Sequence, residues 1–508
     1  MNRRSFLKFT GLTVASLALS GSQGCLLKPS AKKPNVLFIA IDDMNDWVGF
    51  LGGHPQAKTP NMDRLAEKGV NFRNAHIPAP ACSPCRNALL YGIQPFHSGL
   101  YPYYKREKIE PEILAGYTTL PRLFKENGYN TFTSGKVHHG TPRTYDKNTA
   151  TYEWTEHNHE TIRSLPKLVY DTKSGYVAPG RRDTWTFCPT TSPLEHHWDY
   201  VTSQYGVEVL GRKHDKPFFL ALGFIKPHLP FVAPKKYFDL YSDPIKPPAI
   251  KADDLADVPW AGRSNAMLND DLQFRNDEVW EMVRRAYLAC ISWTDANVGR
   301  VLDALERSPW RDNTIVVLWS DHGYHLGEKR SFRKFTLWEE ATRVPFLIWD
   351  TRHKIRKGHR CDEPVSLIDI YPTLTNLVGL KQPDYVDGVS LVPWLKNPGQ
   401  VREEPAITTW GRGNYTIRTR NWRYIRYFDG SEELYYHKQD PDEWKNLAGL
   451  SEFAAKKEEL KKWLPKKEAP LVLSGKAVHF TGDADKPELN NIKRNWKRIN
   501  AIIKPPLE

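Results

Sequence analysis

The sequence predicts an α/β protein with a doubly wound main domain, in which helices cover both faces of a large, mostly parallel sheet. Two near-continuous apolar runs, NVLFIAIDD (35–43) and TIVVLWSDHG (314–323), indicate strands that are buried on both faces. Helical patterns lie between these runs, and this alternation is typical of α/β proteins. At 508 residues the chain exceeds the size at which one core keeps growing, so we expect a second, smaller subdomain.

Three segments between the apolar runs are predicted to be helices. Segments 59–69 (TPNMDRLAEKG) and 119–129 (TLPRLFKENGY) each have a glycine at or near the end, which suits a helix C-cap. Segment 277–306 has the apolar periodicity of one long amphipathic helix. These helices would pack against the predicted sheet.

The composition and the spacing of apolar residues change twice along the chain. Residues 141–215 are polar, rich in Thr, Trp, His and Pro and weakly periodic, so we expect an irregular insert that contributes to specificity. Residues 415–437 alternate polar and apolar side chains around an Asp-Gly turn, which predicts antiparallel strands. We therefore expect a main domain over 33–400 and a C-terminal subdomain over 401–508, with an antiparallel sheet and a helix.

Residues 1–25 have the features of an export signal. Arg3, Arg4 and Lys8 form a positive start, and the apolar stretch 9–19 is too short to span a bilayer. RRSFLK resembles a bacterial twin-arginine signal, and Cys25 is a candidate site for a lipid anchor. No later segment has the roughly 18 uninterrupted apolar residues of a membrane helix. We expect an exported bacterial protein of the periplasm or cell surface.

The amino-acid composition and the net charge limit the classes of molecule that the protein is expected to bind. Hydrophobic residues make up 40% and charged residues 26% of the chain, which is typical of a globular protein and disfavours disorder. The formal net charge is +13, and the signal contributes three of these positive charges without any acid, which leaves +10. A basic surface attracts polyanions. No nucleic-acid motif is present, so a sulfated or carboxylated polysaccharide is the expected partner.

The stretch ACSPCRNALLYG (81–92) holds two of the six cysteines, three residues apart. Six cysteines are too few for a disulfide scaffold in a chain of this length. A zinc site would require a second Cys or His pair at matching spacing, which the sequence does not supply after Cys85. A redox pair and a single reactive cysteine with a neutral neighbour stay open at this point.

Acidic residues and a histidine follow the two predicted strands. In open α/β sheets ligands bind beyond the carboxyl ends of the strands, which is where Asp42, Asp43, Asp321 and His322 lie. Mostly oxygen ligands favour Ca²⁺ or Mg²⁺, and the histidine leaves Mn²⁺ or Zn²⁺ open. The alternative for such acids is a helix N-cap or a loop. Further cations and histidines could hold a multiply charged oxyanion beside the metal: Arg86, Lys136, His138, His139, Lys226, His228 and Lys334.

The segment Cys82-Ser83-Pro84-Cys85-Arg86 resembles the Cys-x-Pro-x-Arg signature of type I sulfatases. Other segments resemble that family in the same order, from about residue 34 to 450 and most weakly over 141–215: PNVLFIAIDD, TPNMDRLAEKGVNFRNAH, FKENGYNTFTSGKVHHG, KPFFLALGFIKPHLPF, SDHGYHLGE and DGSEELYYHKQDPDEWKNLA. GKVHHG, KPHLPF and DHGYHLGE are most similar to the iduronate-2-sulfatase branch and its bacterial polysaccharide relatives. The resemblance implies an alkaline-phosphatase-like α/β/α sandwich.

The resemblance also implies the chemistry. A maturation enzyme would oxidise Cys82 to formylglycine, and one hydroxyl of the hydrated aldehyde would attack sulfur and displace the sugar alcohol. The other hydroxyl would then lose its proton, so that the aldehyde is regenerated and sulfate leaves. Ca²⁺ is the expected metal, with Mg²⁺ as the alternative. Cys85 would be a tolerated second thiol.

Site residues carry over from the family position by position. Asp42, Asp43, Asp321 and His322 would bind Ca²⁺ together with the modified Cys82, and Arg86 would orient the hydrated aldehyde. Lys136 and one histidine of VHHG would contact this group and the sulfate, while His228 and Lys334 would hold the sulfate and assist the leaving oxygen. Lys226 is a further candidate. His138 matches the arylsulfatase spacing and His139 the iduronate-2-sulfatase spacing, so both stay open.

The predicted function is hydrolysis of a sulfate ester on a sulfated sugar or polysaccharide fragment. A phosphomonoester or phosphonate hydrolase is an alternative, because the same fold and the same kind of metal-binding site also support phosphoryl transfer. A catalytically silent protein that binds sulfated glycan is a second alternative, and it would keep Cys82 as a thiol.

Overall fold

A computed structural model of the chain describes residues 33–101, 114, 116–139, 153–178, 185–266, 268–274, 277–353 and 359–470. The predicted export signal over 1–25, with Cys25, lies outside the described residues. Parts of the predicted insert (141–152 and 179–184) and residues 471–508 of the predicted C-terminal subdomain also lie outside them. Within the described part, no helix is both long enough and apolar enough to cross a bilayer.

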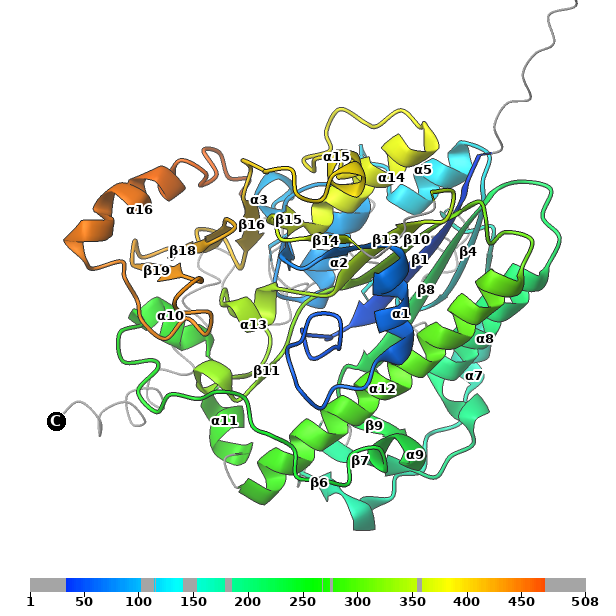
Figure 1. Ribbon diagram of the computed structural model, residues 1–508, viewed down its shortest axis with the longest axis horizontal. Helices are drawn as coiled ribbons and strands as arrows, with labels where there is room; N and C mark the ends of the chain where they lie inside the picture. Colours follow the sequence, from blue (N-terminus) through cyan, green and yellow to red (C-terminus); the bar gives the residue numbers. More distant parts are fainter. Residues whose placement is uncertain are drawn as a thin grey trace, which may run out of the picture. The chain divides into compact units, whose positions relative to one another are not determined.

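A large mixed sheet forms the centre of the molecule (Figure 1). In the part of the chain that the structure describes, its strands lie in the order β14 (His359–Cys361), β2 (Val70–Phe72), β13 (Phe346–Asp350), β10 (Thr314–Ser320), β1 (Asn35–Asp42), β8 (Phe218–Pro227), β4 (Asn130–Gly135) and β5 (Glu156–His157). All neighbours pair in parallel except β13, which is antiparallel to both β10 and β2. The prediction of a large, mostly parallel sheet is confirmed.

The two apolar runs of the sequence become the adjacent strands β1 and β10. Every residue of both strands is buried, as expected for a strand covered on both faces. Their register pairs Asn35 with Thr314 and Ile41 with Ser320. Because parallel strands in this register end together, the acids that follow β1 and β10 emerge at the same edge of the sheet.

Side chains of β1 point alternately into two cores, one on each face of the sheet. Leu37, Ile39 and Ile41 pack with α1 (Pro60–Lys68), α8 (Trp198–Gly211) and α12 (Asp277–Arg307). Val36, Phe38 and Ala40 pack on the other face with α2 (Cys82–Tyr91), α5 (Leu120–Glu126) and α14 (Ile370–Val378). Figure 1 shows these two helical layers on opposite sides of β1, so the α/β/α sandwich is confirmed.

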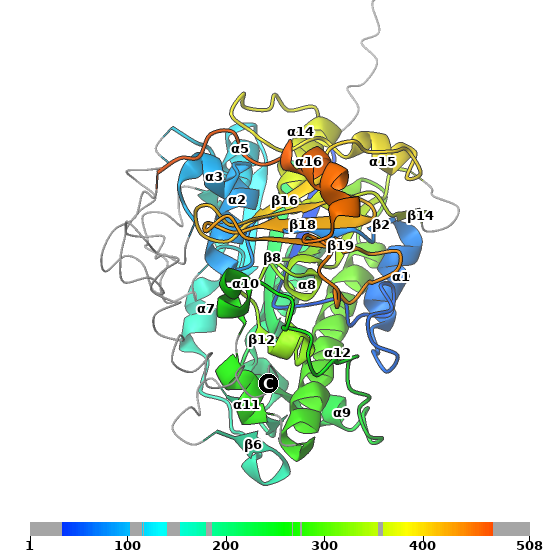
Figure 2. The same ribbon diagram turned by 90° about the vertical axis from the view of Figure 1, so that its left-hand side faces the viewer.

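A separate antiparallel sheet follows towards the C-terminus (Figure 2). It consists of β16 (Ala406–Thr409), β17 (Tyr415–Arg418), β18 (Trp422–Arg426) and β19 (Glu432–Tyr436), paired in sequence order. The turn between β18 and β19 contains Gly430 at φ 83°, a left-handed conformation that glycine adopts without strain. The helix α16 (Ala454–Lys461) follows, so the predicted antiparallel sheet and helix are both present.

Smaller elements complete the described part of the chain. Two-stranded pairs are β3 (Ala75–His76) with β15 (Val365–Ser366) and β11 (His325–Leu326) with β12 (Phe332–Arg333), and β6 (Tyr176–Val177), β7 (Thr186–Thr190) and β9 (Phe231–Pro234) form a third small sheet. Short helices are α3 (Pro95–Ser98), α7 (His159–Ser164), α9 (Lys235–Phe238), α10 (Trp260–Asn265), α11 (Leu268–Phe274), α13 (Glu339–Thr342) and α15 (Val392–Lys396).

The described part of the predicted insert 141–215 is more regular than its sequence pattern indicates. It contributes β5 to the main sheet and α8 to one helical layer. The buried residues of α8 are partly apolar (Tyr205, Val209, Leu210) and partly small or polar (Asp199, Thr202, Ser203, Gly206). Small and polar residues on a buried helix face do not produce the apolar periodicity by which a helix is recognised in a sequence.

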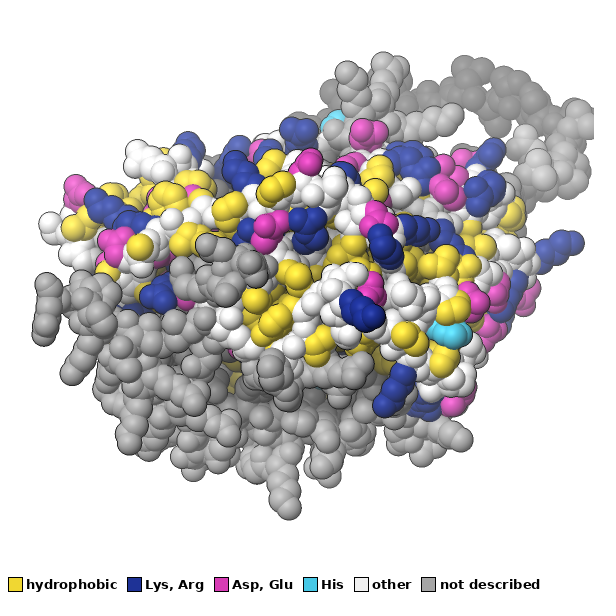
Figure 3. Space-filling view, turned by 90° about the horizontal axis from the view of Figure 1, so that it is seen from below, with side chains coloured by type: hydrophobic (Ala, Val, Ile, Leu, Met, Phe, Trp, Pro, Cys, Tyr) yellow, Lys and Arg dark blue, Asp and Glu magenta, His cyan; other side chains and the backbone are white. Residues whose placement is uncertain are grey.

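The described surface carries both signs of charge. On the face in Figure 3, Lys and Arg side chains are interspersed with Asp and Glu side chains and with apolar ones. The net positive charge of the chain is therefore not gathered into a single large patch among the described residues of this face.

Candidate active site

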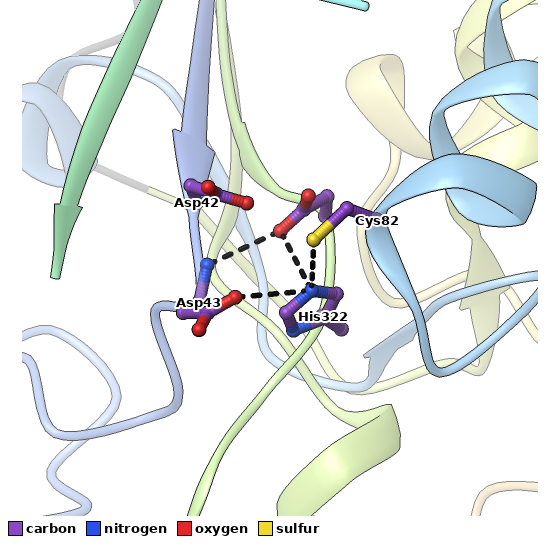
Figure 4. Close-up of side chains that lie close together, drawn as sticks. Asp42, Asp43, Cys82 and His322 are labelled. Atoms are coloured by element: carbon purple, nitrogen blue, oxygen red, sulfur yellow. Dashed lines mark hydrogen bonds and ion pairs between the residues drawn. The ribbon is translucent and has the colours of Figure 1, made fainter. Parts of the chain in front are cut away.

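The helix α2 brings Cys82 to the carboxyl ends of β1 and β10 (Figure 4). Cys82 is the first residue of α2, after Ala81 in extended conformation, and the helix ends at Gly92 with φ 74°. Pro84 lies in the first turn, where a missing backbone N–H breaks no helical hydrogen bond. All ten residues of α2 are buried, so Cys82 faces the site from a rigid support.

Five predicted metal ligands lie together. Asp42, Asp43, Cys82, Asp321 and His322 are all buried, and each offers one ligand atom within 4.8 Å of the others. His322 Nε2 lies 3.1 Å from Cys82 Sγ, 3.1 Å from Asp43 Oδ1 and 3.4 Å from Asp321 Oδ1. Figure 4 shows these side chains converging from β1, β10 and α2.

The turn after β1 is tied to the end of β10. Asp43 has φ 63°, a left-handed conformation that costs free energy in a residue other than glycine. Its backbone N–H donates to Asp321 Oδ1 at 3.2 Å, and Tyr287 Oη donates to its carbonyl oxygen at 2.7 Å. The next N–H, of Met44, donates to Ser320 Oγ at 2.9 Å. These bonds hold the Asp43 carboxylate beside those of Asp42 and Asp321.

The donor set fits a hard divalent cation. Three carboxylates supply oxygen ligands, which Ca²⁺, Mg²⁺ and Mn²⁺ prefer. His322 Nδ1 donates to the carbonyl oxygen of Gly323 at 3.1 Å, so Nε2 keeps its lone pair and faces the cluster.

Arg86 connects the helix to three strand ends. Its guanidinium is fully buried and donates to Asp321 Oδ2 at 2.6 Å and to Asp42 Oδ1 at 3.3 Å. It also donates to the carbonyl oxygens of Lys136 at 2.5 Å and Val137 at 3.0 Å, in the loop after β4. Arg86 therefore fixes the positions of β1, β10 and this loop relative to α2.

Two lysines approach the cluster from opposite sides. Lys334 Nζ lies 2.6 Å from Asp43 Oδ1 and 3.2 Å from Cys82 Sγ, while Lys136 pairs with Asp42. Lys334 stands between Arg333 at φ 73° and Phe335 at φ 81°, both left-handed. Such strained backbone is maintained only where surrounding contacts enforce it, and it often marks a functional position.

The two histidines of VHHG have different surroundings. His138 Nε2 lies 2.8 Å from Glu153 Oε2, away from the acids of the cluster, and Thr119 donates to Glu153 Oε1 at 2.7 Å. Burial lowers the pKa of His139 well below its usual value, and the neighbouring charges of Lys136, Asp42 and Arg86 act on it too. His139 is therefore the histidine that lies near the charged cluster.

Lys226 lies near the end of β8 and His228 in the turn that follows it, and their side chains have different partners. His228 Nε2 is 4.0 Å from Asp43 Oδ2, and burial lowers the pKa of His228 to about 4. The ammonium of Lys226 donates to the carbonyl oxygens of His228 and Pro230. Of the two predicted residues, His228 faces the acids of the cluster, whereas the ammonium of Lys226 is bonded to the backbone of the turn after β8.

The electrostatics of the cluster suit an anion. Burial alone would raise the pKa of Asp42, but Lys136, His228 and Arg86 overcome this effect and lower the pKa well below its usual value. Burial raises the pKa of Asp321 to about 8 in spite of Arg86, so its carboxylate is the one that most needs a further positive charge. Three carboxylates face three permanent cations, and a divalent cation would give the site two net positive charges.

Several residues of the site were not identified from the sequence. Glu153, Asp199 and Tyr287 are buried and hydrogen-bonded to the residues or loops of the cluster. Each lies in a segment without a local motif, so the sequence held no signal for them.

A second group of potential metal ligands consists of Glu339, His437 and Glu443. Its carboxylates form ion pairs with Arg418 and Arg423, so their negative charge is already compensated without a metal.

Comparison with known proteins gives matches over most of the chain. The family described as "Sulfatase" matches residues 34–380, and the one described as "N-sulphoglucosamine sulphohydrolase, C-terminal" matches residues 327–469. A "Sulfatase" of Formosa agariphila is 37% identical over 92% of this chain and 93% of that protein. An "Ulvan-active sulfatase" of the same organism is 29% identical over 86% of this chain and 82% of that protein.

Human iduronate 2-sulfatase is also similar, at 26% identity over 74% of each chain. Among solved structures, a phosphonate monoester hydrolase of Agrobacterium radiobacter has a TM-score of 0.66 and 22% identity, and covers 84% of this chain and 94% of that one. At this identity the structural likeness concerns the fold alone.

Proposed function

This chain belongs to the sulfatase family, and we propose that it hydrolyses the sulfate ester of a sulfated sugar or polysaccharide fragment. The observation that carries the proposal is the position of Cys82, within hydrogen-bond distance of both His322 and Lys334 and among three buried carboxylates. A maturation enzyme would convert Cys82 to formylglycine, whose hydrated aldehyde supplies the nucleophile. The Cys82 thiol marks the place of this group.

Asp42, Asp43, Asp321 and His322 would hold Ca²⁺ together with the modified residue. The cation would lower the pKa of the attacking hydroxyl and neutralise charge on the sulfate oxygens. The site would then have two net positive charges, which a sulfate monoester neutralises in part and the product dianion in full. This balance favours binding of the anionic substrate.

The chain's own cations have separate tasks in this proposal. Lys334 contacts both Asp43 and Cys82, so its ammonium can bind a sulfate oxygen beside the nucleophile. Lys136 pairs with Asp42 on the other side and can bind a second oxygen. Arg86 orients the hydrated aldehyde indirectly, because it fixes the acids and the loop around α2.

We assign the catalytic histidine of VHHG to His139. The support is that the charges acting on His139 are those of the site, whereas His138 is occupied by Glu153. In this assignment His139 would contact the diol and the sulfate, and His138 would hold the loop through Glu153. His228, across the site near Asp43, would assist the leaving oxygen.

A sulfated polysaccharide of the kind that an ulvan-active relative acts on is the first substrate to consider. The excess of basic residues supports a polyanionic partner. Residues 1–25 would direct export to the periplasm or cell surface of a bacterium, with Cys25 as a candidate lipid anchor. The main domain would span 33–400 and the C-terminal subdomain 401–508, with segment 141–215 contributing to specificity.

Sulfate release tests the proposal directly. Protein coexpressed with a maturation enzyme would be incubated with ulvan, carrageenan, fucoidan and glycosaminoglycan oligosaccharides and an aryl sulfate. Ion chromatography would measure free sulfate, with Cys82→Ala as the control. Release from one glycan that is lost in the control is the expected result; no release from any ester by protein with modified Cys82 contradicts the proposal.

A phosphonate or phosphate monoesterase is the second candidate, favoured by the fold likeness to a phosphonate monoester hydrolase. Matched aryl sulfate and aryl phosphate esters distinguish the two functions by their kcat/KM ratio. A protein that binds sulfated glycan without turnover would instead keep Cys82 as a thiol in its own host, which mass spectrometry of the native protein would detect.

A further inference from the structure

The turn that carries His228 is built around a buried lysine. Lys226 is 9% exposed, and its Nζ donates to the carbonyl oxygen of His228 at 2.9 Å and to that of Pro230. These two acceptors belong to the backbone of the same turn, one at His228 and one two residues after it. The ammonium therefore bridges the segment from which the imidazole projects.

The start of the turn is anchored to two helices. Asp199 of α8 accepts the backbone N–H of Ile225 at 2.7 Å and that of Lys226 at 3.1 Å. Thr294 of α12 donates its hydroxyl to the carbonyl oxygen of Lys226 at 2.8 Å. Asp199 and Thr294 are both buried, so the backbone of Lys226 is fixed to the layer that covers the sheet.

The orientation of the imidazole depends on this turn. His228 Nδ1 lies 2.7 Å from the carbonyl oxygen of Leu229; since a carbonyl only accepts, Nδ1 carries the proton and Nε2 points to Asp43. The His228 side chain is 30% exposed, so packing on this side leaves part of the ring uncovered. Its direction is therefore set mainly by the carbonyl of Leu229, which lies between the two carbonyls that Lys226 holds.

An ammonium in this place has a free-energy cost. Burial lowers the pKa of Lys226, with Cys290 and the Asp199 carboxylate acting in the opposite direction. A buried charge is retained only where hydrogen bonds and opposite charges compensate its lost hydration. An apolar side chain of similar length would avoid this cost but would leave the carbonyls of His228 and Pro230 without this donor.

We propose that Lys226 is a positioning residue that holds the turn 225–230 so that His228 Nε2 faces the leaving oxygen of the sulfate ester. This inference rests on the proposed function, in which His228 assists that oxygen. Lys226 acts through the backbone of the turn and makes no contact with the substrate. Asp199 and Thr294 transmit the rigidity of α8 and α12 to the same turn.

The test is the dependence of rate on the leaving group. Full-length protein with modified Cys82 would be assayed on aryl sulfates whose phenols range from 4-nitrophenol, a good leaving group, to phenol, a poor one. Help with departure of the oxygen matters most for the poor leaving group. For Lys226→Met we expect kcat/KM to fall by about tenfold or more on phenyl sulfate and by less than about threefold on 4-nitrophenyl sulfate.

Three further variants separate positioning from general damage. His228→Ala should steepen the leaving-group dependence in the same way, and adding Lys226→Met to it should cost little more, because both act through one imidazole. Lys58→Met is the matched control, since Lys58 also donates to a backbone carbonyl, that of Leu240, outside the turn. Its leaving-group dependence should equal that of the unchanged protein.

The kinetic outcomes distinguish the role of Lys226 from the proposed function. An equal loss on every ester, or losses that multiply in the double variant, would overturn the role of Lys226. An inactive unchanged protein would overturn the proposed function instead. If Lys226→Met does not fold, Asp199→Asn removes an acceptor of the same turn and should steepen the dependence, and an unchanged slope in that folded variant would count against the proposal.

Discussion

At the residue scale, adjacent side chains in one motif have different surroundings. His138 and His139 are neighbours, yet the first meets Glu153 and the second lies among the charges of Lys136, Asp42 and Arg86. The contact of His138 with Glu153 is the observation on which we propose His139 for the catalytic role. The same reasoning separates His228, which faces Asp43, from Lys226, which supports it.

The two histidines can be distinguished by substitution. We expect His139→Gln to lower kcat/KM for sulfate release by about 10²-fold or more, because a catalytic proton donor or acceptor is lost. His138→Gln should cost less than about tenfold, because glutamine can still bond to Glu153. Steady-state kinetics on one aryl sulfate measures both. Equal losses, or a larger loss in His138→Gln, would move the catalytic role to His138.

At the element scale, the site depends on loops that are held by close backbone contacts. Gly223 of β8 lies against the backbone of Lys136, where an added Cβ would come within 2.1 Å of the carbonyl carbon. Lys334 belongs to a segment that is bonded to the residues just before α2, because the backbone N–H of Phe335 donates to the carbonyl oxygen of Pro80 at 3.1 Å. On its other side, Arg423 of β18 donates to the carbonyl oxygen of Leu337 at 2.9 Å. The C-terminal sheet thus helps to position a lysine of the main domain.

Gly223→Ala should displace the loop that carries Lys136 and His139. We expect sulfate release to fall by more than about tenfold, since small displacements of catalytic groups are costly. Gly211→Ala is the matched control, because a Cβ at Gly211 would meet no atom within 4 Å. Kinetics of the two folded variants, with circular dichroism to compare their folds, provides the measurement. Full activity of Gly223→Ala would show that the loop tolerates the shift.

Arg423→Met should destabilise the protein. The Arg423 side chain is fully buried and pairs with Glu339 and Glu443, so its loss leaves buried carboxylates with too little positive charge. Breaking such a pair costs about 3–5 kcal/mol, and urea unfolding would measure this loss. Arg426→Met, at an exposed position of the same strand, should change the free energy of unfolding by no more than about 0.5 kcal/mol. Similar effects of the two substitutions would contradict the importance of the buried pairs.

At the scale of the whole molecule, one candidate metal site joins separate parts of the fold. Its candidate ligands come from the ends of β1 and β10 and from the first residue of α2, which packs on the opposite face of the sheet from α1, α8 and α12. Without a cation, the three carboxylates repel one another and depend on Arg86, Lys136 and Lys334 for compensation. Binding of a cation should therefore stabilise the sandwich as well as enable turnover.

Chelation should lower both activity and thermal stability. After treatment with a chelator, added Ca²⁺ should restore sulfate release and raise the midpoint of thermal unfolding; at 100 times the dissociation constant the stabilisation is about 2.7 kcal/mol. Differential scanning calorimetry with Ca²⁺, Mg²⁺ and Mn²⁺ would identify the preferred ion. Asp42→Asn, which removes one ligand charge, should abolish most of the shift. A chelated protein that keeps full activity would exclude the metal from the mechanism.

The sequence by itself determined the sheet, the edge at which the site lies and the family. Buried apolar runs that end in acids are local patterns, and a strand buried on both faces must have such a run, so β1, β10 and their Asp and His residues could be predicted. The Cys-x-Pro-x-Arg signature was equally local. The strands within segment 141–215 and the helix α8 were not predicted, because their buried faces mix small and polar residues with the apolar ones and so lack a clear apolar period.

Only the tertiary structure decided which side chain points where. It paired His138 with Glu153, directed the Lys226 ammonium to backbone carbonyls of the following turn, and brought in Asp199 and Tyr287 from segments that carry no motif. The physical reason is that direction and burial depend on packing between elements far apart in the chain. A sequence records which groups are present, and the fold decides which of them meet.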